Sequence, residues 1–100
     1  MEAARAVVLF DGACPLCSRE IAHYRRRRGA EHICWIDATR DADALRVLGI
    51  EQADALARFH VLAADGVWHT GAAGFVELWS HLPAYAWLSR WVLRLRLLGA

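Results

Sequence analysis

Residues 6–17 read AVVLFDGACPLC and contain the strongest structural signal in the chain. The first five form a continuous run of β-branched, aliphatic and aromatic side chains, which is typical of a buried central strand. Asp11-Gly12 then predicts a turn. Pro15 favours the first turn of a helix, where its missing N–H group costs nothing. The stretch therefore predicts a strand and a helix joined by a short turn, with two cysteines at the junction.

Cys14 and Cys17 form a Cys-x-x-Cys pair at this junction. A cysteine at a helix start faces free N–H groups and the positive end of the helix dipole, and both favour the reactive thiolate. We expect Cys17, one turn further along, to be shielded from large substrates but within reach of Cys14. The pair predicts attack by Cys14 on a disulfide, followed by resolution of the mixed disulfide by Cys17. Two inert core cysteines are the structural alternative.

The remaining sequence predicts three further strands and three further helices. The first helix should end at Gly29, with Cys17, Ile21 and Tyr24 on its core face. The other elements are expected as strands at 32–37, 59–62 and 67–70, and as helices at 41–48, 75–82 and 84–98.

The order of these elements predicts a mixed sheet. The first two strands enclose a helix and should pair in parallel through a right-handed crossover. Asp65-Gly66 is a strong hairpin signal, so the last two strands should be antiparallel. A mixed four-stranded sheet covered by helices, with Cys-x-x-Cys opening the first helix, is the thioredoxin-like α/β arrangement. We expect one such domain over residues 1–100, with its core at 6–82 and an extra helix at 84–98.

Composition narrows the function classes. Twelve basic and eleven acidic residues give a net charge of +1, which favours no nucleic-acid partner. Three cysteines are too few, and odd in number, for a secreted disulfide scaffold. The start of the sequence has no signal-peptide pattern, so we expect the reducing cytoplasm. In a reducing cytoplasm, a Cys-x-x-Cys pair indicates a functional site rather than a structural disulfide.

The motif Asp-Gly-x-Cys-x-x-Cys at residues 11–17 resembles the DCC family of thiol-disulfide oxidoreductases (domain of unknown function 393), named for its Asp and two Cys. Asp65-Gly66 before an aromatic strand, and a short helix ending at Leu82-Pro83, are similar to the same family. The likeness covers about residues 6–90. It implies a thioredoxin-like fold and protein-disulfide reductase activity on a disulfide-bearing protein or a small thiol substrate. No cofactor is expected beyond the dithiol, which needs an external thiol donor or acceptor.

One position departs from thioredoxins. They carry a cis-proline just before a later strand, where it faces the cysteines and helps to dock the substrate backbone. The prolines of this chain are Pro15 and Pro83, and Arg58 precedes the third predicted strand. We therefore expect substrates to dock more loosely or in a different way.

Asp11 is the third candidate catalytic residue. It is a candidate general base for Cys17 during resolution. The thioredoxin aspartate with this role lies farther upstream, so the positions do not correspond. The structural alternative is an Asx turn that shapes the loop, which we favour. A carboxylate here would also oppose a thiolate at Cys14.

Cys34 lies in the second predicted strand, where a free cysteine usually packs as a small hydrophobic residue. The alternative is a Cys₃His zinc site formed by Cys14, Cys17, His32 and Cys34. The alternative function is a non-enzymatic binding module, with the cysteines holding zinc or simply buried and the Trp-rich basic tail docking a partner.

Two basic segments complete the sequence pattern. Residues 25–28 are four arginines that offset the dipole at the end of the first helix, and a nucleic-acid patch is the less favoured alternative. Residues 87–96 contain three arginines and two tryptophans, which predicts a basic amphipathic helix. We expect this helix to pack on the domain's own sheet. A homodimer or another partner docked on the Trp-rich helix stays open, and a membrane surface is less favoured.

Overall fold

The computed structural model describes residues 4–99, and it has the α/β architecture expected from the sequence. Its elements follow in the order β1 (Ala6–Phe10), α1 (Pro15–Arg25), a 3₁₀ turn η1 (Ala30–His32), β2 (Ile33–Asp37), α2 (Ala42–Leu48), α3 (Gln52–Ala57), β3 (His60–Ala63), β4 (Trp68–Thr70), α4 (Ala72–Ser80) and α5 (Ala86–Gly99).

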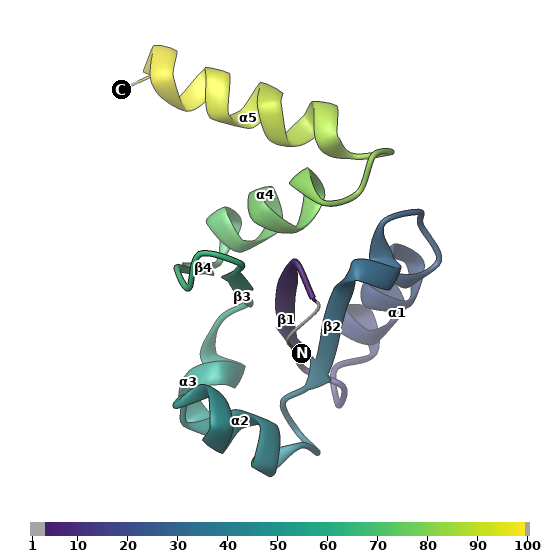
Figure 1. Ribbon diagram of the computed structural model, residues 1–100, viewed down its shortest axis with the longest axis vertical. Coiled ribbons are helices and arrows are strands. Elements are labelled where there is room, and N and C mark those ends of the chain that lie inside the picture. The colour runs from purple at the N-terminus through teal and green to yellow at the C-terminus, as the bar shows by residue number, and fades with distance from the viewer. Residues whose placement is uncertain (1–3, 100) are drawn as a thin grey trace.

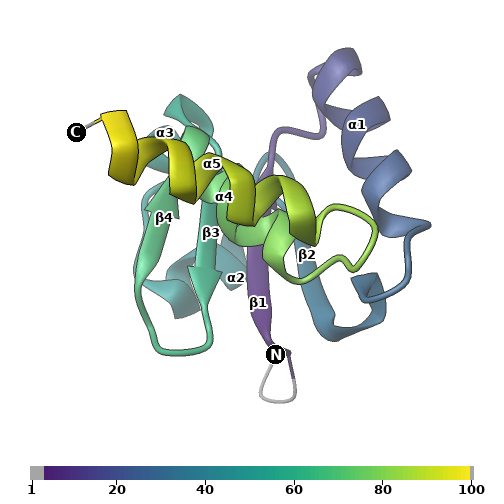
Figure 2. The ribbon, with the colours of Figure 1, turned by 90° about the horizontal axis from the view of Figure 1, so that it is seen from above.

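The four strands form one mixed sheet in the order β2-β1-β3-β4 (Figure 2). Strand β1 pairs in parallel with β2 and antiparallel with β3, and β3 pairs antiparallel with β4. At the centre, Val8 lies opposite Trp35 on one side and Val61 on the other. The predicted thioredoxin-like sheet, with a parallel crossover and an antiparallel hairpin, is confirmed.

Helices cover both faces of the sheet, which explains why β1 is apolar along its whole length. Val8 faces α1 and α4 in a cluster whose other members include Ile21, Tyr24, Leu78 and Leu82. The neighbouring side chains of β1 point the opposite way, into a cluster with α2 and α3 that contains Val7, Leu9, Ile36, Leu45 and Ala55. Figure 1 shows α2 and α3 on one side of the sheet and α4 and α5 on the other. Strand β1 is therefore the buried centre of the molecule.

The first helix is shorter than predicted. It ends at Arg25, with Arg26 as its C-cap, although we expected it to continue to Gly29. The chain does turn at Gly29, where φ is 98°. A Cβ atom there would lie 2.4 Å from the carbonyl oxygen of His81. Glycine is therefore required at this position both by the left-handed backbone and by the close approach of the α4–α5 connection.

Two other helices differ from the sequence prediction. Helix α3 was not predicted, because only one of its six residues, Ala55, is buried and the sequence shows no clear period. Helix α4 begins at Ala72, so Gly74 lies inside it rather than before it. A Cβ atom at Gly74 would lie 3.0 Å from the ring of Phe59 and 3.1 Å from the carbonyl oxygen of His69. This glycine allows α4 to pack closely on the hairpin.

Helix α5 packs against α4, which corrects the expectation that it would lie on the sheet. Ser89 is 3% exposed, and its Oγ donates a hydrogen bond to the carbonyl oxygen of Val76 at 3.0 Å. In Figure 1, α4 lies between α5 and the strands. The sheet face is already filled by α1 and α4, so α5 forms an outer layer. Within residues 4–99 we find no helix with the length and apolar character needed to cross a membrane.

Candidate active site

The structure places Cys14 at the N-cap of α1, directly before Pro15. The backbone N–H of Cys17 donates a hydrogen bond to the Cys14 sulfur, with the nitrogen 3.4 Å from Sγ. The Cys14 side chain therefore occupies the capping position that an oxygen usually fills, where free N–H groups favour negative charge. All three cysteines of the chain are free thiols.

The structure corrects the expected environment of Cys17. Its side chain is exposed, whereas Ile21 and Tyr24, further along the same side of α1, are each only 5% exposed. Helix α1 meets the sheet through Ile21 and Tyr24, and Cys17 precedes both in the first turn. The second thiol is therefore open to the surface instead of shielded beneath Cys14, which is partly buried.

The pKa values of the two thiols are shifted in opposite directions. Hydrogen bonds from the Cys17 side chain and backbone lower the pKa of Cys14, and they outweigh the opposing effects of burial and of the Asp11 charge. The same hydrogen bond raises the pKa of Cys17 to about 11, assisted by burial and by the negative charges of Cys14, Asp11 and Glu20. Cys14 is thus the thiol that ionises first, and Cys17 keeps its proton and stabilises the thiolate.

Asp11 forms the predicted Asx turn. Its Oδ1 accepts a hydrogen bond from the N–H of Ala13 at 3.0 Å, and its carbonyl oxygen accepts one from the N–H of Cys14 at 3.2 Å. Its charge raises the pKa of both cysteines. These contacts support the loop-shaping role of Asp11.

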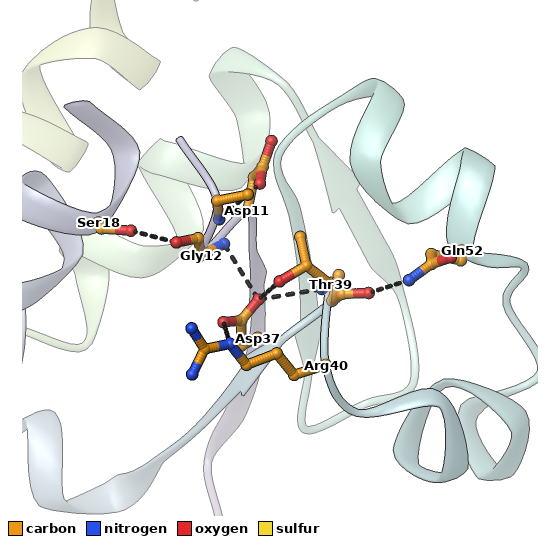
Figure 3. A network of polar contacts seen from close by, with 9 residues as sticks. Asp11, Gly12, Ser18, Asp37, Thr39, Arg40 and Gln52 are labelled. Carbon is orange, nitrogen blue, oxygen red and sulfur yellow. Dashed lines mark hydrogen bonds and ion pairs between the residues drawn. The ribbon is translucent and has the colours of Figure 1, made fainter. Parts of the chain in front are cut away.

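A residue that sequence reasoning missed, Asp37, holds the loop from the neighbouring strand (Figure 3). Its Oδ1 accepts hydrogen bonds from the N–H of Gly12 at 3.0 Å and from the N–H and Oγ1 of Thr39 at 3.0 and 2.6 Å. Arg40 approaches the other oxygen, with Nε 3.7 Å from Oδ2. Burial alone would raise the pKa of Asp37, but these hydrogen bonds and the Arg40 charge outweigh it and lower the pKa.

Gly12 is fixed on both sides of its backbone. Its N–H donates to Asp37, and its carbonyl oxygen accepts a hydrogen bond from Ser18 Oγ of α1 at 3.0 Å (Figure 3). A Cβ atom at Gly12 would lie 1.8 Å from Oδ2 of Asp37, so a larger residue would displace the Asp37 carboxylate or the loop. One sequence signal for Asp37 existed: it is a polar residue at the end of the second predicted strand.

A pocket of about 300 Å³ lies beside Cys17. Cys17 and Ile21 of α1 line one side, and the segment 55–59 ahead of β3 lines the other. Most of the lining is apolar, with Phe59 stacked on Phe75 at 4.2 Å between ring centroids. Asp11, Glu20 and Arg58 provide its charged groups.

Arg58, which lies two residues before β3, lines this pocket. Its backbone is extended, with φ −150° and ψ 161°. A long cationic side chain therefore lines the pocket beside Cys17. No cis peptide bond occurs among the described residues, and the expected difference in substrate docking stays a prediction.

Cys34 lies apart from the Cys14–Cys17 pair. It packs with Val7, Leu9 and Ile36 on the face of the sheet covered by α2 and α3, whereas α1 covers the opposite face. The four ligands of the zinc alternative are therefore not brought together. Among residues 4–99, no group of three or more His, Cys, Asp or Glu side chains is arranged to hold a metal ion.

Comparison with known proteins identifies the family. A family model described as DCC1-like thiol-disulfide oxidoreductase matches residues 8–99. Neither the curated proteins nor the solved structures gave a match. Because the family model spans nearly the whole chain, the protein belongs to the DCC1-like thiol-disulfide oxidoreductases. This membership supports a redox role for the cysteine pair.

Proposed function

We propose that this member of the DCC1-like family is a protein-disulfide reductase in which Cys14 attacks the substrate and Cys17 resolves the intermediate. The observation that supports this assignment is that the pKa values of the two thiols are shifted in opposite directions. Cys14 caps a helix and has a lowered pKa, whereas the pKa of Cys17 is raised to about 11. At neutral pH the pair therefore offers one nucleophile and one protonated partner.

In the first step, the Cys14 thiolate attacks one sulfur of the substrate disulfide. The substrate S–S bond breaks, a mixed disulfide forms on Cys14, and the leaving thiolate takes a proton from solvent. The hydrogen bond from Cys17 to the Cys14 sulfur is lost as that sulfur becomes neutral. The largest cause of the raised Cys17 pKa then disappears, which prepares Cys17 for ionisation.

In the second step, Cys17 loses its proton and attacks the Cys14 sulfur. The mixed disulfide breaks, the substrate leaves as a dithiol, and a Cys14–Cys17 disulfide remains. Asp11 lines the same pocket as Cys17 and is the proposed proton acceptor in this step. Two electrons have passed to the substrate, and an external thiol donor returns the pair to the dithiol.

The pocket beside Cys17 is the proposed docking site for the substrate. Its mostly apolar lining suits an apolar side chain next to a protein disulfide, and the charged groups at Asp11, Glu20 and Arg58 can orient the flanking backbone. We expect no cofactor beyond the dithiol. A reducing cytoplasm is the compartment that would keep such a pair in its active form.

Single cysteine variants test the proposal in a disulfide reduction assay with dithiothreitol as electron donor. Cys14→Ser should lower the rate to that of dithiothreitol alone. Cys17→Ser should still react once and accumulate a mixed disulfide that mass spectrometry detects. Cys34→Ser, a control on the other face of the sheet, should keep the wild-type rate. A Cys14→Ser protein with wild-type activity would reject the assigned nucleophile.

A further inference from the structure

The outer side of α5 exposes large apolar side chains. Trp87 and Trp91 are 57% and 56% exposed, and Leu95 is 47% exposed. Because they are spaced four residues apart, they form one row along the helix. The opposite side of the helix holds it on α4, where Ser89 is buried. The side chains of the apolar row are therefore exposed and are not the ones that hold α5 on α4.

A basic row lies beside the apolar one. Arg90 and Arg94 are both exposed and are also four residues apart, one position before Trp91 and Leu95. Within the described part of the chain, neither arginine has a carboxylate within salt-bridge distance. The sequence contains no acidic residue after Glu77. The outer side of α5 therefore combines an uncompensated positive row with an apolar row.

We propose that this side of α5 binds the surface of an anionic lipid bilayer, with the helix axis parallel to the membrane plane. Tryptophan prefers the membrane–water interface because its ring is apolar but its N–H needs a polar partner. Arginine side chains are attracted to anionic headgroups and pair with their phosphates. An apolar row next to a basic row is the pattern of helices that lie in the interface without crossing it.

A second copy of the chain fits this surface less well. Two α5 helices packed through their outer sides would bring Arg90 and Arg94 of both copies into one interface. Residues 78–100 supply no carboxylate to neutralise them. Anionic headgroups supply that counter-charge directly. Charge complementarity therefore favours a lipid surface over a homodimer through α5.

Vesicle co-sedimentation of the full chain tests the proposal. The protein should bind vesicles of phosphatidylcholine mixed with phosphatidylglycerol at least about tenfold more strongly than pure phosphatidylcholine, and added salt should weaken the binding. Arg90→Gln/Arg94→Gln should lower the partition coefficient on mixed vesicles by about tenfold. Trp87→Ser/Trp91→Ser should also lower it, through loss of the apolar row.

A matched control is available at the end of α1. Arg26→Gln/Arg28→Gln removes the same charge from two exposed arginines and should leave vesicle binding unchanged. The urea midpoint and the alkylation rate of Cys14 show that each variant is folded. The proposal is overturned by equal binding to both vesicle types, or by an equal loss in the control pair. It is also overturned by absent vesicle binding with a dimer that Trp87→Ser/Trp91→Ser dissociates.

Discussion

The two segments that border the pocket beside Cys17 are held in place in different ways. The loop before α1 is fixed by polar contacts: Gly12 donates to Asp37 and accepts from Ser18, and Asp11 accepts from the N–H of Ala13. Two of these bonds come from other elements, β2 and α1, and the third lies within the loop, so together they fix where the loop lies.

The segment 55–59 is held mainly by apolar contacts. Ala55 is 3% exposed in the cluster of α2 and α3, and Phe59 stacks on Phe75 of α4. Leu56 and Arg58 are exposed toward the pocket. We propose that the loop controls the chemistry of the thiols and that the segment controls what docks against them. The two properties should therefore be separable by mutation.

Gly12→Ala should have the largest effect, because it disrupts the polar contacts that hold the loop before α1. The added Cβ would meet the Asp37 carboxylate at 1.8 Å, so the carboxylate or the loop must move and the Gly12–Asp37 hydrogen bond is lost. We expect a loss of about 2–4 kcal/mol in the free energy of unfolding, from overpacking and an unsatisfied N–H group. Urea unfolding measures it, with Ala13→Ser at the exposed neighbouring position as control. An unchanged free energy of unfolding would contradict the role of the Gly12–Asp37 contact in holding the loop.

Asp37→Ala should have the second largest effect. It leaves the Gly12 and Thr39 donors without their acceptor, which costs about 1–3 kcal/mol. Because the folded pKa of Asp37 is lowered, its contribution to stability is present above the unfolded pKa and is lost as the pH falls through the folded pKa. The stability difference between wild type and Asp37→Ala should therefore shrink in acid. A difference that grows toward low pH would refute the assignment.

Leu56→Ser tests the apolar segment 55–59 that lines the pocket. Leu56 is 37% exposed in the pocket lining, so its loss should change stability little. Removing its apolar surface should raise the KM for a protein disulfide about threefold to tenfold. The alkylation rate of Cys14 should not change. Val47→Ser, on the outer surface of α2 and 73% exposed, is the control. A slower Cys14 with an unaltered KM would show that the two segments are not separable.

Asp11→Asn should have the smallest effect on the fold, because the amide oxygen can still accept from the Ala13 N–H. Loss of the charge should lower the pKa of both cysteines, since the carboxylate raises both. Cys14 should then be alkylated slightly faster at neutral pH. If Asp11 also accepts the Cys17 proton, resolution of the mixed disulfide should become slower in the same variant. Faster alkylation with unchanged resolution would leave Asp11 with the turn role alone.

Sequence patterns predicted the local structure of this molecule better than the contacts between residues that are far apart in the sequence. The strand–turn–helix of residues 6–25 follows from neighbouring residues, and so do the Asx turn of Asp11 and the Asp65-Gly66 hairpin. Asp37 is 25 residues away from Gly12, and the two meet only through the register of β1 and β2. No short motif encodes such a register.

The errors at Cys17 and α5 have a common physical cause. Helical spacing places Cys17 on the same side as Ile21, but the spacing does not show where along the helix the sheet contact begins. The apolar pattern of α5 likewise predicts a packed face without naming the partner, which is α4 and not the sheet. Both outcomes depend on the relative placement of whole elements.

The most direct test of the account is the pH dependence of alkylation of Cys14 and Cys17, followed separately by mass spectrometry of their peptides. Cys14 should react with a midpoint below that of an ordinary thiol, and Cys17 should react with a midpoint near its raised pKa of about 11. In Cys17→Ala the midpoint of Cys14 should rise, because the main hydrogen bond to its thiolate is gone. Faster alkylation of Cys17 than of Cys14 at neutral pH would contradict the assignment of nucleophile and resolving thiol.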